Sequence, residues 1–147
     1  MYNKVMWATD GSEAADRALV HAKSLAAASA TPLLVVYCEE FMVPAKGGGS
    51  LPVHANEAEL RAKIEHQIAE IGDNGTSATL EITRSMSGGA AHAIAEIAAR
   101  EHADLIVVGT RGHTPLVGLL LGGVTQRLLH IAPCPVLAVP PDRNGTG

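Results

Sequence analysis

Short apolar runs alternate along the whole chain with segments in which apolar residues recur at helical spacing. The apolar runs predict strands at residues 4–9, 32–38, 79–83, 105–108 and 136–139. The helical segments between them place apolar residues three or four positions apart, as in Leu60, Ile64, Ile68 and Ile71. Five strands that alternate with four helices predict an α/β fold. Its sheet should be mostly parallel and doubly wound, with right-handed crossovers and helices on both faces.

The chain length and the segment at residues 39–56 bear on the domain organisation. At 147 residues the chain has the size of one domain, and residues 1–147 are predicted to fold as a single domain. Residues 39–56 interrupt the alternation, because they follow no period and contain three successive glycines at 47–49 and two prolines. We expect a long irregular loop there, which is either a lid-like mobile segment or a solvated linker without a role.

Charge and hydropathy exclude several classes of partner. The net charge is −4, and no basic block could neutralise a run of phosphates, so nucleic acid is not an expected partner. No apolar stretch reaches 18 residues and the first residues do not form a signal peptide, so we expect a cytoplasmic protein that does not enter the membrane. Cys38 and Cys134 lack CxxC spacing and are expected to be two reduced thiols.

Two strand-to-helix turns carry the residues that point to a ligand. In an open parallel sheet, ligands bind outside the carboxyl ends of the strands, where helix N-termini offer unpaired N–H groups. The first turn, at residues 8–12 (ATDGS), places an aspartate directly after the first strand. Asp10 could contact a ligand, or Asp10 or Ser12 could cap the helix that follows. From the turn alone, both alternatives stay open.

The second turn, residues 109–125 (GTRGHTPLVGLLLGGVT), is rich in glycine and follows the fourth strand. Glycine lets backbone N–H groups approach a polyphosphate, because a Cβ would block the approach and many such turns need a positive φ. The spacing Gly-x2-Gly-x9-Gly is neither GxxxxGK[ST] nor GxGxxG, and the loop contains no lysine. The two most common phosphate-loop motifs are therefore excluded, which leaves a different phosphate site or a flexible connection.

Several motifs resemble, in their order along the chain, those of the universal stress protein family. They are ATDGSEAADRAL near the start, GGAAHAI at residues 88–94, LIVVG followed by TRG and later by GG, and the final VTQRLLHIAPCPVLAVP. The resemblance runs from about Lys4 to Val139 and fails only in the 39–56 segment. It implies a Rossmann-like domain with the strand order 3-2-1-4-5 and an adenine nucleotide bound in the crevice of the sheet.

The resemblance also implies a set of nucleotide-binding residues. The spaced glycines would hold the phosphates and ribose, and the turn after the first strand would lie beside the ribose and adenine. The backbone of the second strand would read the adenine edge, and the helix after the glycine loop would complete the phosphate site. In this order the residues are Gly109, Gly112 and Gly122; Ala8, Thr9 and Asp10; Val36; and Gly123, Val124 and Thr125.

The chain departs from the family pattern at Gly123, where a serine or threonine is expected. A hydroxyl that donates to a charged phosphate is worth about 1.5–3 kcal/mol, which is roughly ten- to over a hundredfold in affinity. The backbone N–H of Gly123, the N-terminus of the helix and nearby Thr125 remain. We therefore expect nucleotide binding to be weakened rather than lost.

The leading hypothesis is a nucleotide-dependent switch in the stress response. ATP, or ADP or AMP, with Mg²⁺ bridging the phosphates, would order the 39–56 segment and change partner binding. No HExxH motif, carboxylate pair or GxSxG elbow is present, so we expect no catalytic residue, no metal site of protein ligands and at most slow ATP hydrolysis. One alternative is a dimeric stress-related interaction protein that does not use nucleotide; a flavin carrier is disfavoured by the scarcity of aromatic residues.

The last strand, Val136 to Val139, is expected to mediate dimer formation. It is short and apolar and carries no charged residue that would repel another strand edge. With the strand order that the resemblance implies, it lies at an edge of the sheet. The resemblance further implies a homodimer in which this strand pairs with its symmetry mate in antiparallel orientation across a two-fold axis.

Overall fold

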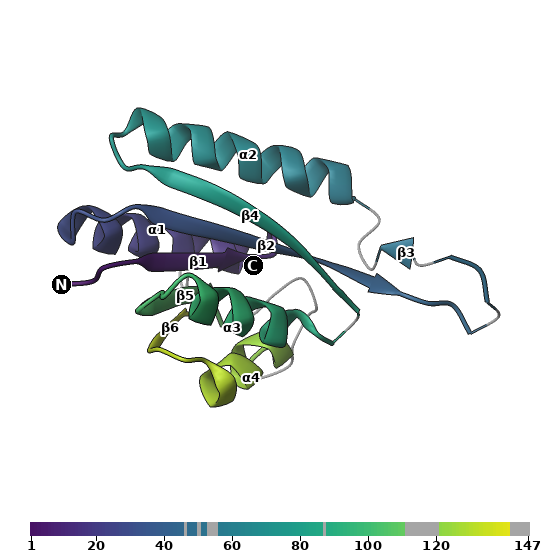
Figure 1. Cartoon of the computed structure of the whole chain (residues 1–147). Helices are drawn as coiled ribbons and strands as arrows, with labels where there is room; N and C mark the ends of the chain where they lie inside the picture. The colour runs from purple at the N-terminus through teal and green to yellow at the C-terminus, as the bar shows by residue number, and fades with distance from the viewer. Residues whose placement is uncertain (46, 50, 53–55, 87, 111–120, 142–147) are drawn as a thin grey trace.

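A computed structural model describes residues 1–45, 47–49, 51–52, 56–86, 88–110 and 121–141 (Figure 1). The strands are β1 (Val5–Thr9), β2 (Leu33–Met42), β3 (Leu51–Pro52), β4 (Ala78–Met86), β5 (Leu105–Gly109) and β6 (Val136–Val139). The helices are α1 (Glu13–Ala28), α2 (Glu57–Asp73), α3 (Ala90–Arg100) and α4 (Gly123–Ile131). In these ranges no helix is both long enough and apolar enough to cross a membrane.

The predicted α/β fold is confirmed; the five predicted strands pair in the predicted order, but the sheet also has a sixth strand, β3, which pairs with β2. From edge to edge the order is β4-β2-β1-β5-β6, and every pairing along it is parallel. Each parallel pair is joined through at least one helix, as right-handed crossovers require. The chain thus begins in the centre of the sheet, winds outward to β4, and then crosses back to add β5 and β6 on the other side of β1.

The prediction of an irregular loop over residues 39–56 is wrong in part. Strand β2 continues to Met42, and β3 pairs with its end in antiparallel orientation, Phe41 opposite Pro52 and Met42 opposite Leu51. The extension forms because β4 runs beside β2 as far as Met86 and supplies a hydrogen-bonding partner for it. Beyond the end of β1, the strands β2 and β4 therefore project together, with β3 beside β2 (Figure 1).

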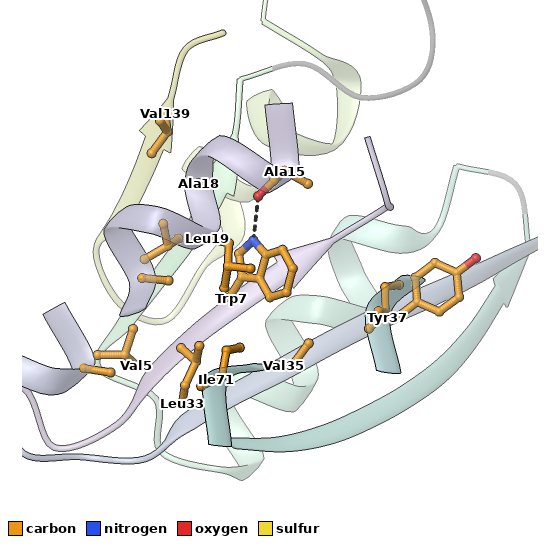
Figure 2. Close-up of a cluster of buried hydrophobic side chains, with 14 of the residues drawn as sticks. Val5, Trp7, Ala15, Ala18, Leu19, Leu33, Val35, Tyr37, Ile71 and Val139 are labelled. Atoms are coloured by element: carbon orange, nitrogen blue, oxygen red, sulfur yellow. Dashed lines mark hydrogen bonds between the residues drawn. The ribbon is translucent and has the colours of Figure 1, made fainter. Parts of the chain in front are cut away.

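Alternate residues of the central strands point to opposite layers of helices. Val5 and Trp7 pack with α1 and α2, whereas Met6 and Ala8 pack with α3 and α4, so the sheet is covered on both faces. Figure 1 shows α1 and α2 on one side of the sheet and α3 and α4 on the other. Figure 2 shows the first of these clusters, in which the fully buried Trp7 donates its indole N–H to the Ala15 carbonyl of α1 at 3.0 Å.

Candidate functional site

The carboxyl ends of β1 and β5 adjoin in the middle of the sheet, where the winding direction reverses. Val5, Met6 and Trp7 of β1 pair with Leu105, Ile106 and Val107 of β5. The chain leaves β1 into α1 and leaves β5 toward α4, and these helices lie on opposite faces of the sheet. A reversal of this kind opens a crevice at the sheet edge and brings helix N-termini to it. The structure thus places the first turn and the described ends of the second, residues 109–110 and 121–125, at one edge.

The turn between β1 and α1 is closed by its own side chains. The Thr9 hydroxyl accepts a hydrogen bond from the Gly11 N–H at 3.0 Å, and the Asp10 carboxylate accepts one from the Ser12 N–H at 2.9 Å. The hydroxyl of Ser12 accepts from the Ala15 N–H at 3.3 Å and caps α1. The cap is therefore Ser12, while Asp10 shapes the turn before the helix. That turn holds one oxygen of Asp10 in place at the edge of the sheet.

Gly11 joins this turn to α2, which sequence reasoning did not connect with the site. Its φ of +81° lies in the left-handed region, and a Cβ there would come within 2.5 Å of the Leu60 Cδ2 atom. The Gly11 carbonyl also accepts a hydrogen bond from the Lys63 ammonium at 2.8 Å. One signal in the sequence could have suggested this contact. Lys63 and Gln67 lie four positions apart beside the apolar stripe of the helix, as polar residues at a buried boundary do.

Gly109 at the end of β5 has a packing role that the sequence did not reveal. A Cβ on Gly109 would lie 2.8 Å from the Ala14 carbonyl carbon and 2.9 Å from the Ala14 Cβ. The first turn of α1 can therefore approach the end of β5 only because residue 109 is glycine. This contact fixes the start of α1, and with it the β1–α1 turn, relative to β5.

The N-terminus of α4 is built differently, because no side chain caps it. Its cap residue is Gly122, in extended conformation with φ −61° and ψ 153°, and it makes no side-chain cap hydrogen bond. The Gly122 N–H donates to the Thr110 carbonyl at 2.7 Å, which ties the cap to the end of β5. Gly123 is exposed, with nothing within 4 Å of the place where its Cβ would be. The side of α4 on which a Gly123 side chain would lie therefore adjoins open space among the described residues.

Thr125 has its hydroxyl committed within the protein. It is only 4% exposed, and its hydroxyl donates to the Gly109 carbonyl at 2.6 Å. A threonine hydroxyl has a single hydrogen to donate. Thr125 can thus offer a ligand only its backbone N–H, and its side chain instead fastens α4 to β5. Val124 lies between Gly123 and Thr125 in the chain and is 37% exposed.

Ala8 and Val36 lie deeper in the sheet than the two turns. They are partners in the β1–β2 register, and both are buried. Val36 also pairs with Glu81 of β4, so it has a strand on each side. Cys38 is the first residue of β2 beyond the last β1 pair, Thr9 with Tyr37. On the β1 side, the β2 backbone is therefore unpaired among the described strands from Cys38 to Glu40, before β3 pairs with Phe41, and not at Val36.

Burial dominates the chemistry of this part of β2. The Cys38 thiol lies 3.2 Å from the Ser85 hydroxyl, and burial raises the pKa of the thiol. Burial, and secondly its hydrogen bond to the Glu57 carboxylate, raises the pKa of Tyr37. Neither group ionises near neutral pH, so Cys38 is not an activated nucleophile. Gly112 lies outside the described residues; the other predicted site residues lie along the carboxyl ends of β1, β2 and β5 and the start of α4.

Comparison with known proteins identifies similar chains over the whole length. The model of the universal stress protein family matches residues 1–140. A universal stress protein of Thermus aquaticus is 34% identical over 139 residues, which cover 95% of this chain and 99% of that protein. The structure of a universal stress protein in complex with cAMP has a TM-score of 0.65 at 26% identity, covering 96% of this chain and 98% of the other. One from Archaeoglobus fulgidus in complex with dAMP has a TM-score of 0.65 at 22% identity, covering 95% and 98%.

Proposed function

Because the chain belongs to the universal stress protein family, we propose that it binds an adenine nucleotide at the carboxyl edge of its sheet and acts as a nucleotide-dependent switch. The observation that carries the proposal is the start of α4. Gly122 caps this helix without a side chain, and Gly123 leaves open space in front of its first turn. Backbone N–H groups at a helix N-terminus with room before them suit a phosphate. The complexes of two similar proteins with cAMP and dAMP support an adenine nucleotide as the ligand.

The residues at this edge fit the parts of such a ligand. The N–H groups of Gly123, Val124 and Thr125 would receive the phosphates. The Asp10 carboxylate, which accepts from the Ser12 N–H within the turn, is proposed as the contact for a ribose hydroxyl. The β2 backbone past the end of β1 would read the adenine edge, and the register favours Cys38 over Val36 for this. Gly112 remains a proposed phosphate contact from the sequence motif.

We propose ATP as the nucleotide, with ADP or AMP as the alternatives, and Mg²⁺ as a bridge between the phosphates. The described residues contain no group of three or more His, Cys, Asp or Glu side chains that could hold a metal. The ion would accordingly be held by phosphate oxygens and water rather than by a protein cage. Without a hydroxyl at residue 123 to donate to a phosphate, the affinity is expected to be micromolar to millimolar.

Calorimetric titration of the purified protein with Mg-ATP up to several millimolar tests this proposal. Heat of binding and a raised unfolding temperature are expected, with mass spectrometry identifying any nucleotide released from the purified protein. The matched variant is Gly123→Asp, because its Cβ would fit in open space while its carboxylate would repel the phosphates. It should fold normally and lose more than tenfold in affinity. No binding by the unmodified protein, or equal binding by G123D, would contradict the site.

A second candidate is a dimeric interaction protein that does not use nucleotide. Two observations favour this candidate. Gly123 has no hydroxyl, and the Thr125 hydroxyl already donates to the Gly109 carbonyl. Both candidates include a homodimer through β6. Among the described strands this edge strand pairs with β5 alone, and its Leu137 is 36% exposed. The exposed side chains Val124 and Leu129 of α4 add apolar surface to the same end of the chain.

The dimer is tested by Ala138→Pro, which removes a donor from the proposed strand pairing and leaves α4 intact. Size exclusion with light scattering should give a dimer for the unmodified protein at tens of micromolar and a shift toward monomer for A138P. Circular dichroism must show that the variant is folded. A monomeric unmodified protein would exclude the dimer, and a folded A138P that stays fully dimeric would exclude the β6 interface.

A further inference from the structure

We infer that Lys63 of α2 is a positioning residue for the proposed nucleotide site, acting through the backbone of Gly11. The inference rests on the proposed function, since it concerns the turn that carries Asp10. Lys63 lies far from this turn in the sequence, and its ammonium donates to the Gly11 carbonyl at 2.8 Å. Gly11 directly follows Asp10. Lys63 is thus bonded to the peptide next to the residue that we propose for ribose binding.

The ammonium of Lys63 is held on a second side by α1. It forms an ion pair with Asp16 at 2.7 Å, and the Gln67 amide donates to the other oxygen of the same carboxylate at 2.9 Å. Asp16 lies in the first helical turn of α1, which directly follows the β1–α1 turn. Lys63 therefore connects three elements: the β1–α1 turn, the start of α1 and the middle of α2.

The same turn also rests on an apolar contact from α2. The Leu60 side chain fills the space in which a Gly11 Cβ would lie, and it is 5% exposed. Leu60 and Lys63 are three positions apart, so they lie on one face of the helix and contact Gly11 together. Their combined contact leaves the left-handed Gly11 little freedom to change its backbone conformation. The position of the Asp10 carboxylate then depends on where α2 lies.

Helix α2 is in turn fixed to the projecting part of β2. Glu57 in its first turn accepts a hydrogen bond from the Tyr37 hydroxyl, and Arg61 contacts the buried Glu39 carboxylate at 2.5 Å. A movement of β2 beyond Tyr37 would therefore move α2, and α2 would move the turn. Nucleotide binding at the turn and the docking of α2 must stabilise each other to the same extent, because such coupling is reciprocal.

Lys63→Met tests the inference, because methionine keeps an apolar stem and removes the ammonium. Without nucleotide, amide exchange followed by NMR at Gly11 and Ser12 should accelerate about tenfold, since both amides donate within the turn. Nucleotide affinity should fall about five- to tenfold. Lys63→Arg should restore both, because a guanidinium can donate to the carbonyl and the carboxylate.

Two matched variants separate positioning from general stability. Gln67→Met removes the other contact of α2 with Asp16 but leaves Gly11 untouched, and Lys23→Met removes a lysine about three helical turns along α1 from Ser12. Neither should change exchange at Gly11 and Ser12. Equal exchange in K63M and Q67M would overturn the inference. If the unmodified protein binds no nucleotide, the proposed function fails, while the exchange rates in its absence still decide the role of Lys63.

Discussion

The β1–α1 turn and the start of α4 lie at the same sheet edge but are built in opposite ways. In the first, Thr9, Asp10 and Ser12 each accept a hydrogen bond from a nearby N–H, and Leu60 and Lys63 hold Gly11 from outside. In the second, the capping residue is a glycine without a side-chain hydrogen bond, and the next residue has open space beside it. The first region supplies its own side-chain acceptors, whereas among the described residues no side chain caps the start of α4.

This difference indicates how binding energy would be distributed over a nucleotide. The turn is already ordered, so a ribose that contacts Asp10 would cost little conformational entropy. The helix start has N–H groups that gain acceptors only when an anion arrives, so most of the electrostatic gain would arise there. Substitutions in the first region should therefore change stability, and substitutions at the second should change affinity.

The largest effect is expected when a methyl group is added to Gly109, which packs against the start of α1, and is compared with the same change at Gly123 at the start of α4. Gly109→Ala would place a Cβ 2.8 Å from the Ala14 backbone, so the start of α1 must shift, and the free energy of unfolding should fall by about 3 kcal/mol. Gly123→Ala meets no atom within 4 Å and should raise it by up to about 1 kcal/mol through helix propensity. Urea denaturation of the two variants measures both values. Similar free energies of unfolding for the two variants would show that a side chain is accommodated equally well at both positions.

The next effect concerns Thr125, which connects the start of α4 to the end of β5. Thr125→Val keeps the shape of the side chain but removes its hydrogen bond to the Gly109 carbonyl, so unfolding free energy should fall by about 2 kcal/mol. Thr125→Ser keeps the hydroxyl and loses one methyl group, which costs about 1 kcal/mol. Denaturation curves rank the two variants. A greater loss in the serine variant would mean that packing of the methyl group, and not the hydrogen bond, holds α4 to β5.

The sequence pattern was sufficient for the fold class because the β-rich runs and helical periods are local, whereas the strand order was implied by the family resemblance. It failed at the end of β2, where Glu39 and Glu40 interrupt the apolar run. Glu39 is nevertheless 7% exposed, because Arg61 of α2 lies against its carboxylate. A residue far along the chain thus allows a strand to continue through a charged position. No local pattern contains that information.

The same limit applies to the candidate site. The glycine spacing and the aspartate turn indicated the two regions, because a required glycine or carboxylate can be recognised from the residue type at a single position. The contact of Gly109 with Ala14 and that of Gly11 with Lys63 depend on how α1 and α2 lie against the sheet. The position of Val36 likewise depended on where β1 ends, which only the register gives. These contacts and this register are set by the tertiary structure and leave at most a weak signal in the sequence.

Gly123→Ser should sharpen the difference by adding a donor to the open region. The hydroxyl would adjoin the first-turn N–H groups, and Mg-ATP should bind about tenfold more tightly by calorimetry. Gly123→Ala is the control, because it raises helix propensity without adding a donor. Serine and alanine variants with the same affinity would show that no phosphate lies within reach of residue 123.

The smallest effect is expected from the cap of α1. Ser12→Ala removes the acceptor for the Ala15 N–H, so the free energy of unfolding should fall by about 1 kcal/mol. Its backbone N–H still donates to the Asp10 carboxylate, so the turn keeps its shape and nucleotide affinity should change less than twofold. The matched control is Ser24→Ala at an exposed position of the same helix, which should be neutral or slightly stabilising. If S12A instead lost affinity in proportion to stability, order in the turn would depend on the helix cap. The turn would then not be a preformed part of the site, and the contrast with the start of α4 would disappear.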